Sequence, residues 1–148
     1  MKTVSEILKL KGSEVFSVSP DSSVYDALRI MADKQIGALL VVDEGEVSGI
    51  MSERDYARKV ILQGKLSKDT LVREIMSPRV LYVTKEQSTE DCMALMINKR
   101  IRHLPVFENE RLAGLISIGD VVKAVIDEKE FTIDQLVNYI TGKPNLKQ

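Results

Sequence analysis

Two stretches that lie 65 residues apart determine the fold of this chain: Gly49-Ile50-Met51-Ser52-Glu53-Arg54-Asp55 and Gly114-Leu115-Ile116-Ser117-Ile118-Gly119-Asp120. Each begins with a glycine and an apolar pair and continues with the pattern Ser-x-x-Asp. A short apolar run is typical of a buried strand, and Ser-x-x-Asp is typical of the first turn of a helix. Both stretches therefore predict a strand that leads directly into a helix.

The similarity extends well beyond these stretches, since residues 15–55 align with residues 80–120 without a gap. Twelve of the 41 aligned positions are identical. The leading segments match as well, because Val4-Ser5-Glu6-Ile7-Leu8 resembles Val72-Arg73-Glu74-Ile75-Met76. Self-similarity of this kind indicates a duplicated structural unit.

Each copy predicts the order strand, helix, strand, strand, helix. Serines followed by aspartates mark the helix starts, and apolar runs mark the strands. In the first copy we expect strands over 15–18, 38–42 and 47–51 and helices over 23–37 and 52–61. In the second copy we expect strands over 103–107 and 112–116 and a last helix over 121–127. A short helix over 71–76 is expected in the link between the copies.

The C-terminal region predicts a further, separate amphipathic helix. Thr132 and Gln135 resemble a helix start, and Gly142 with Pro144 is expected to end this helix. A three-stranded sheet with two helices is too small to bury both faces alone, so the copies are expected to pack as one body. The predicted fold class is α/β, with domains at 3–66 (including an N-terminal helix), 67–128 and 129–148.

The amino-acid composition narrows the range of possible functions. The 148 residues are 44% apolar and 29% charged with a net charge of −1, which does not favour a nucleic-acid binder. A single cysteine, Cys92, and a single histidine, His103, do not provide the usual zinc ligands. No apolar run approaches the ~20 residues of a membrane span. We expect a cytoplasmic protein that does not contact the membrane and, in the absence of catalytic motifs such as GxGxxG or HExxH, is not an enzyme.

Together with Arg100-Ile101-Arg102-His103-Leu104-Pro105-Val106, the two quoted stretches resemble the cystathionine-β-synthase-type (CBS) domain family, in the form of a stand-alone tandem pair. The resemblance covers residues 3–128. It implies two β-α-β-β-α units that pack about a pseudo-twofold axis, with flanking N- and C-terminal helices. It also implies clefts that in many members bind AMP, ADP, ATP, NAD or S-adenosylmethionine, and assembly as a homodimer.

The Ser-x-x-Asp pattern has a chemical interpretation and a structural one. A carboxylate at a helix start can accept hydrogen bonds from two ribose hydroxyls, each worth about 1.5–3 kcal/mol. The same pattern also caps a helix without any ligand, and we expect only capping at Ser23 with Asp26 and at Ser88 with Asp91. The resemblance implies that Asp120 and Asp55 bind the ribose.

The two copies carry different charges at the candidate ligand positions. Arg100, Arg102 and His103 align with Gln35, Gly37 and Ala38, so a phosphate-binding group is expected mainly in the second copy. Arg54 stands where the second copy has Gly119. The full set is Val80, Arg100, Ile101, Arg102, His103, Leu115, Ser117, Gly119 and Asp120 for one site, and Ile36, Gly37, Ser52, Arg54 and Asp55 for the other.

Two functions remain open at this point. The first is a regulatory sensor that binds an adenine nucleotide such as AMP, ADP, ATP or NAD and signals to an effector protein of unknown identity. The alternative is a non-catalytic dimeric interaction scaffold with vestigial nucleotide clefts, which Arg54 favours. A nucleic-acid binder that uses Arg100, Arg102 and Arg111 is a more distant option.

Overall fold

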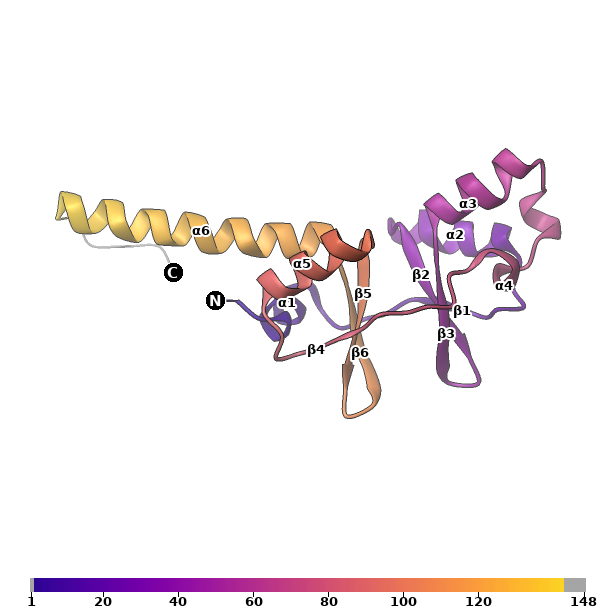
Figure 1. Ribbon diagram of the computed structural model, residues 1–148, viewed down its shortest axis with the longest axis horizontal. Helices are drawn as coiled ribbons and strands as arrows, with labels where there is room; N and C mark the ends of the chain where they lie inside the picture. Colours follow the sequence, from indigo (N-terminus) through magenta and orange to yellow (C-terminus); the bar gives the residue numbers. More distant parts are fainter. Residues whose placement is uncertain (1, 143–148) are drawn as a thin grey trace. The chain divides into compact units, whose positions relative to one another are not determined.

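The computed structural model describes residues 2–142 and contains two compact units of mixed α/β structure (Figure 1). Residues 14–81 form the Asp55 unit, and residues 2–13 together with 82–142 form the Asp120 unit. Each unit contains one three-stranded sheet and its own hydrophobic core. The α/β fold class and the duplicated unit are therefore confirmed.

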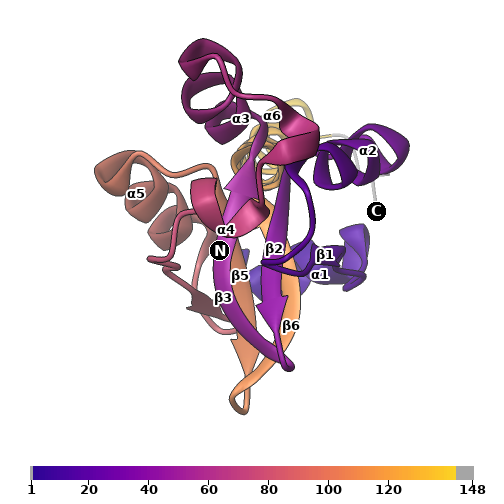
Figure 2. The same ribbon diagram turned by 90° about the vertical axis from the view of Figure 1, so that its right-hand side faces the viewer.

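The sheet of the Asp55 unit has the strand order β1-β2-β3. β1 (Ser17–Val18) runs parallel to β2 (Ala38–Asp43), and β2 pairs antiparallel with β3 (Glu46–Ser52). Three helices and two 3-10 turns complete the unit: α2 (Val24–Lys34), α3 (Glu53–Lys59), η1 (Ile61–Gln63), η2 (Ser67–Asp69) and α4 (Val72–Ile75). Figures 1 and 2 place the β2–β3 turn at the end of the strands that is remote from α2 and α3.

The Asp120 unit repeats this topology. β4 (Val83–Thr84) runs parallel to β5 (His103–Glu108), which pairs antiparallel with β6 (Arg111–Ser117). Its helices are α1 (Val4–Lys11), α5 (Thr89–Lys99) and α6 (Ile118–Thr141). β1 is shorter than the strand expected over 15–18, since only two of its residues pair with the neighbouring strand, and β4 is equally short.

Local signals in the sequence explain the helix ends. The Ser23 hydroxyl accepts a hydrogen bond from the Asp26 amide at 3.1 Å, and Ser88 does the same for Asp91 at 3.1 Å. These two helices end at Gln35 and Arg100, both in the left-handed conformation with φ of 55°. The expected capping at these positions is confirmed, and each helix presents its apolar side to its own sheet.

The two leading helices belong to the opposite units from those expected. α1 packs in the Asp120 unit, whereas the expected division at 66 kept it with the first copy. Residues 67–81, with α4, pack instead in the Asp55 unit. The two connections are equivalent, because Thr3 forms an antiparallel bridge with Ser88, and Leu71 forms one with Ser23. Each unit is therefore completed by a leading segment from outside its own copy.

The two repeated glycines are explained by this exchange. A Cβ atom at Gly114 would lie 2.7 Å from Cδ2 of Leu8 in α1. A Cβ atom at Gly49 would lie 2.8 Å from Sδ of Met76 and 2.7 Å from the carbonyl oxygen of Ser77. Glycine is needed in each last strand because the leading segment crosses it there at close range.

The C-terminal region is one helix and not two. α6 is continuous from Ile118 to Thr141, whereas we expected a break after 127 and a new start at Thr132. The Thr132 hydroxyl donates to the Glu128 carbonyl at 3.0 Å, a bond made inside a helix and not at its start. Gly142 ends the helix in the left-handed conformation as expected, and Pro144 lies outside the described residues.

Candidate functional site

Asp120 is held at the start of α6 by a reciprocal pair of hydrogen bonds. The Ser117 amide donates to Oδ2 of Asp120 at 2.8 Å, and the Asp120 amide donates to the Ser117 hydroxyl at 3.2 Å. The carboxylate lies where β6 ends and α6 begins, because Ser117 is both the last residue of the strand and the cap of the helix. Its side chain remains 25% exposed, so a ligand can reach it.

Lys11 of α1 forms an ion pair with this carboxylate. Its Nζ lies 2.6 Å from Oδ2 of Asp120 and donates to the Leu115 carbonyl at 2.7 Å. Within residues 2–142, the bonds from Lys11 Nζ and from the Ser117 amide both fall on Oδ2 of Asp120. Oδ1 is therefore the oxygen that remains available to an incoming hydroxyl donor.

His103 lies beside this cluster on β5. Its backbone is in register with Ser117, and the Arg102 carbonyl accepts a hydrogen bond from the Ile118 amide at 2.8 Å. Burial lowers the pKa of His103, and the positive charges of Lys11 and Arg102 lower it further against the opposing effect of Asp120. The ring is therefore neutral at physiological pH.

The pKa of Asp120 reflects opposing effects. Burial raises it, but the hydrogen bonds from Lys11 and Ser117 and the charge of Lys11 lower it more, so the net pKa lies below the ordinary value. Asp120 is therefore ionised at physiological pH, and each of its oxygens is able to accept hydrogen bonds.

The equivalent cluster of the Asp55 unit is built differently. The Ser52 amide and hydroxyl both donate to Oδ2 of Asp55, at 2.9 Å and 3.1 Å. The second oxygen, Oδ1, lies 3.3 Å from Nζ of Lys59, one turn further along α3. Lys59 also donates to the Ile75 carbonyl at 2.9 Å. Both carboxylate oxygens of Asp55 are thus already engaged.

Four other predicted ligand residues belong to the same two helix starts: Gly37 and Arg54 in the Asp55 unit, and Arg102 and Gly119 in the Asp120 unit. Gly37 accepts a hydrogen bond from the Glu53 amide at 3.0 Å, as Arg102 does from Ile118. Arg54 is exposed on α3, and Gly119 is exposed at the equivalent position of α6, where an added Cβ would meet only the Ser117 hydroxyl at 3.6 Å. The structure therefore brings these predicted residues together at the two helix starts.

For the other predicted ligand residues, all within the described part of the chain, the structure gives no hydrogen bond or ion pair with Asp55 or Asp120. Arg100 is the left-handed residue that ends α5, and its side chain is exposed. Ile101 packs against the core of the Asp120 unit, and Ile36 against the core of the Asp55 unit. Leu115 is half-buried on β6, and its carbonyl is occupied by Lys11. Val80 lies in the segment that belongs to the Asp55 unit.

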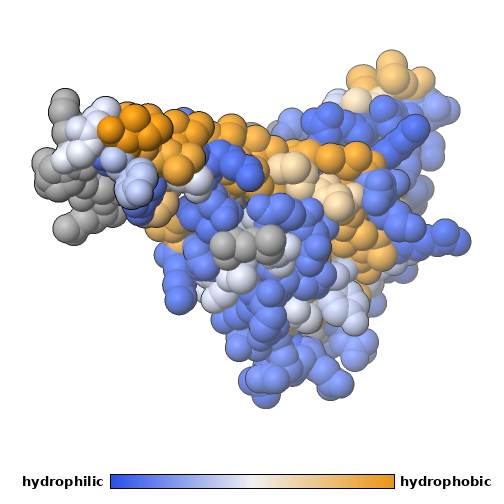
Figure 3. Space-filling view, turned by 60° about the vertical axis from the view of Figure 1, so that its left-hand side comes forward, coloured by the Kyte–Doolittle hydropathy of each residue, from blue (hydrophilic) through white to orange (hydrophobic). Residues whose placement is uncertain are grey.

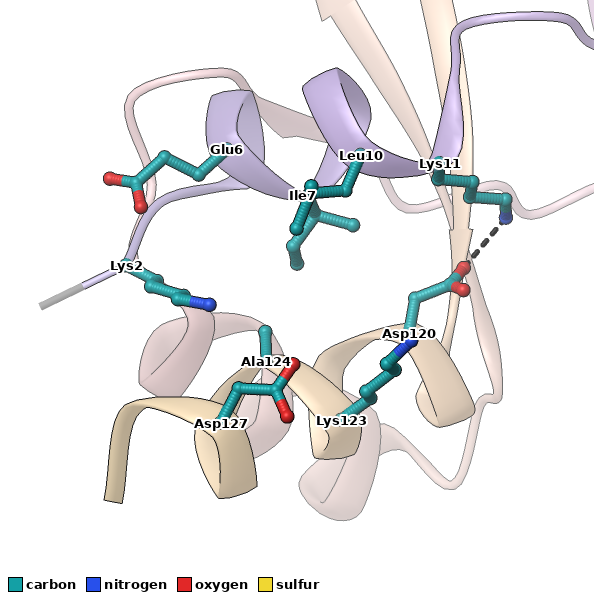
Figure 4. A pocket seen from close by; sticks show the side chains of 9 residues that line it. All are labelled: Lys2, Glu6, Ile7, Leu10, Lys11, Asp120, Lys123, Ala124 and Asp127. Atoms are coloured by element: carbon teal, nitrogen blue, oxygen red, sulfur yellow. Dashed lines mark hydrogen bonds and ion pairs between the residues drawn. The ribbon is translucent and has the colours of Figure 1, made fainter. Parts of the chain in front are cut away.

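A pocket of about 210 Å³ lies between α1 and α6 and includes the Lys11–Asp120 pair (Figure 4). Figure 4 shows Ile7 and Leu10 of α1 facing Ala124 of α6, with charged side chains around them. Sites for drug-sized ligands are usually about 300–1,000 Å³. The pocket is therefore large enough for only part of a nucleotide.

Sequence reasoning missed the two lysines. Lys59 could have been found from its i, i+4 spacing to Asp55. Lys11 is 109 residues from Asp120, and its contact depends on the exchange of the leading helices. Among residues 2–142, no three histidine, cysteine, aspartate or glutamate side chains are grouped so that they could hold a metal ion. Over the same range, no helix has both the length and the apolar character needed to cross a membrane.

Comparison with known proteins identifies relatives of the same architecture. The model of the CBS domain matches residues 4–61 and 72–127. The mitochondrial CBS domain-containing protein CBSX3 of Arabidopsis thaliana is 41% identical over 95% of this chain and 72% of its own length. CBS domain-containing protein YhcV of Bacillus subtilis is 30% identical over 80% of this chain and 84% of its own length.

Solved structures agree with these sequence matches. A CBS-domain protein from Burkholderia ambifaria is 54% identical over 85% of this chain and 95% of its own, with a TM-score of 0.83. The CBS domain pair of protein MJ0100, solved with 5′-methylthioadenosine and S-adenosyl-L-methionine, has a TM-score of 0.76 at 23% identity, over 86% of this chain and 98% of its own. CBS-domain pairs are regulatory modules. The two tandem matches and the two repeated units together show that this chain belongs to the CBS domain family.

Proposed function

We propose that this chain is a regulatory module that binds an adenosine-containing ligand, such as AMP, ADP, ATP or NAD, through its ribose at Asp120. The observation that carries the proposal is the open Oδ1 of an ionised carboxylate at a helix start. One ribose hydroxyl can donate to Oδ1 without disturbing the bonds on Oδ2. The second hydroxyl competes with Lys11 for Oδ2, since that oxygen already accepts two donors.

Arg102 and neutral His103 supply the groups that a phosphate would need. Arg102 is exposed, its backbone carbonyl accepts a hydrogen bond from the Ile118 amide at the start of α6, and the imidazole of His103 can donate one hydrogen bond. The corresponding residues of the Asp55 unit, Gly37 and Ala38, offer neither. The Asp120 unit is therefore the preferred site, and Asp55 is a weaker one.

Competition for Lys11 offers a route for a signal. When a ribose hydroxyl displaces Lys11 from Asp120, α1 loses one of its polar bonds to α6. Residues 12–16 join α1 directly to β1 of the Asp55 unit. A change in α1 therefore acts on the Asp55 unit through the chain itself, and an effector protein would detect the resulting shift in population.

Isothermal titration calorimetry with AMP, ATP, NAD and S-adenosylmethionine tests the proposal. We expect heat with at least one of these ligands and at least about tenfold weaker binding for Asp120→Asn, since one charge-assisted contact is lost. Asp91→Asn is the matched control, because Asp91 has the same spacing to a capping serine but lies at the start of α5. The absence of heat with every adenosine ligand would refute the proposal.

The dimeric scaffold is the second candidate. It is favoured by the engagement of both Asp55 oxygens and by Arg54 in place of a glycine. It requires that none of these nucleotides raises the melting temperature of the protein. A rise of several degrees at saturating ligand would exclude it, since ligand bound to the folded state alone stabilises that state.

A further inference from the structure

The outer face of α6 carries an apolar stripe that the rest of the described chain leaves exposed. Figure 3 shows hydrophobic side chains gathered in a band along this helix. The side chains of the stripe are between 38% and 80% exposed: Val122, Ile126, Ile133, Leu136, Val137 and Ile140. At 100° per residue these positions fall within an arc of about 100°. The buried residues Val121 and Ala124 lie on another face of the helix.

We propose that this stripe binds the same stripe of a second copy of the chain in an antiparallel pair of helices. The helix carries one residue of the seam at every fourth and third position in turn, which is the spacing of a coiled coil: Val122, Ile126, Lys129, Ile133, Leu136 and Ile140. The stripe is about 27 Å long, and two copies together would bury on the order of 1,000 Å². This is the lower limit for a specific interface between proteins.

The direction of pairing follows from Lys129, the charged residue within the seam. In a parallel pair in register, the two Lys129 side chains would face each other, and like charges would repel at the centre of the interface. In an antiparallel pair centred on residue 131, Lys129 faces Ile133 of the second copy. Val122 then faces Ile140 of the second copy, and Ile126 faces Leu136. Each of these apolar side chains therefore has an apolar partner across the interface.

The inference is independent of nucleotide binding. Resemblance to the family implies a homodimer without identifying its surface, whereas the exposed stripe specifies one surface and one direction. In the antiparallel arrangement the two helix dipoles lie side by side and point in opposite directions, which is favourable.

Sedimentation velocity on the full chain over a concentration series tests the surface. We expect the wild type to dimerise and Ile133→Glu with Leu136→Glu to be monomeric, with at least about 100-fold weaker association. Gln135→Glu is the matched control, because Gln135 is exposed on the same helix but outside the stripe. A monomeric wild type would overturn the inference and assign the stripe to another partner, and a Glu variant that dimerises like the wild type would place self-association elsewhere.

Disulfide cross-linking tests the direction. We expect the double variant Val122→Cys with Ile140→Cys to cross-link under mild oxidation and the single variant Val122→Cys not to, since its two thiols would lie about 27 Å apart. Cys92 is buried and does not compete. A cross-link formed by the single variant Val122→Cys would show parallel pairing and overturn the antiparallel arrangement.

Discussion

Replacement of Lys11 by methionine removes the ion pair to Asp120 while it keeps most of the aliphatic stem. Nζ of Lys11 lies 2.6 Å from Oδ2 of Asp120, and the two side chains are 38% and 25% exposed. Fully exposed ion pairs contribute about 0.2–1 kcal/mol, and charge-assisted hydrogen bonds about 1.5–3 kcal/mol. This half-exposed pair lies between those limits, so we expect a loss of about 1 kcal/mol, or roughly 3 °C in melting temperature.

The loss should depend on pH in a defined way. Because the pKa of Asp120 is lowered in the folded state, the unfolded state takes up the proton first as the pH falls. The stabilisation is therefore present above the ordinary aspartate pKa of about 3.9 and disappears as the pH falls through the lower pKa of the folded protein. The difference between wild type and Lys11→Met should be constant near neutral pH and shrink below about pH 4.

Urea unfolding at a series of pH values measures this difference. His103, the single histidine of the chain, gives a second measurement by NMR titration. Because the Lys11 charge lowers the pKa of His103, Lys11→Met should raise it. Lys9→Met on the same helix is the control, since Lys9 is exposed, and it should change neither quantity. A loss of stability that is equal at pH 7 and pH 3 would attribute the effect of Lys11 to packing and refute the ion-pair argument.

Three further predictions concern stability and reactivity. Glu110→Gly should stabilise the folded state by about 1 kcal/mol in urea unfolding, because Glu110 holds a left-handed φ of 64° at the β5–β6 turn; no gain would show that the turn is unstrained. Gly114→Ala should cost about 1–3 kcal/mol in thermal melts, because its Cβ would lie 2.7 Å from Leu8, whereas Gly119→Ala should cost nothing, because its Cβ would make only an ordinary contact with the Ser117 hydroxyl at 3.6 Å; equal effects would contradict the role assigned to Leu8. Burial and the charge of Asp91 raise the pKa of the Cys92 thiol to about 11, so Cys92 should resist a thiol reagent at pH 8 until the protein unfolds; rapid labelling of the folded protein would show that the core opens.

Much of the fold could be predicted because its signals are local. Ser23 and Ser88 cap their helices with their own neighbours, and the apolar runs of β2 and β5 are buried as their composition requires. The break expected at Thr132 was wrong because a threonine with a glutamine three residues later occurs both at a helix start and inside a helix. Only the position of its hydroxyl, on the Glu128 carbonyl, distinguishes the two.

The exchange of leading helices could not be predicted from the same signals. α1 and α4 have similar apolar patterns, and the sequence does not indicate which of them crosses at Gly114 and which at Gly49. The choice between them depends on packing over the whole chain, which periodicity does not encode. Lys11 was missed for the same reason, although Ser117 and Asp120 were correctly placed at one helix start.

The two copies share the capped aspartate but differ in how its charge is balanced. Lys59 is anchored one turn along the same helix as Asp55, and with Ser52 it engages both carboxylate oxygens. Lys11 comes from a separate helix and shares Oδ2 with Ser117, so Oδ1 of Asp120 stays open. In the proposed function, a hydroxyl donor would share Oδ1 of Asp55 with Lys59, whereas it would meet no other donor on Oδ1 of Asp120 and would compete with Lys11 only at Oδ2. Displacement of Lys11 would release α1, a helix from outside the second copy, so the proposed function assigns sensing to Asp120 and not to Asp55.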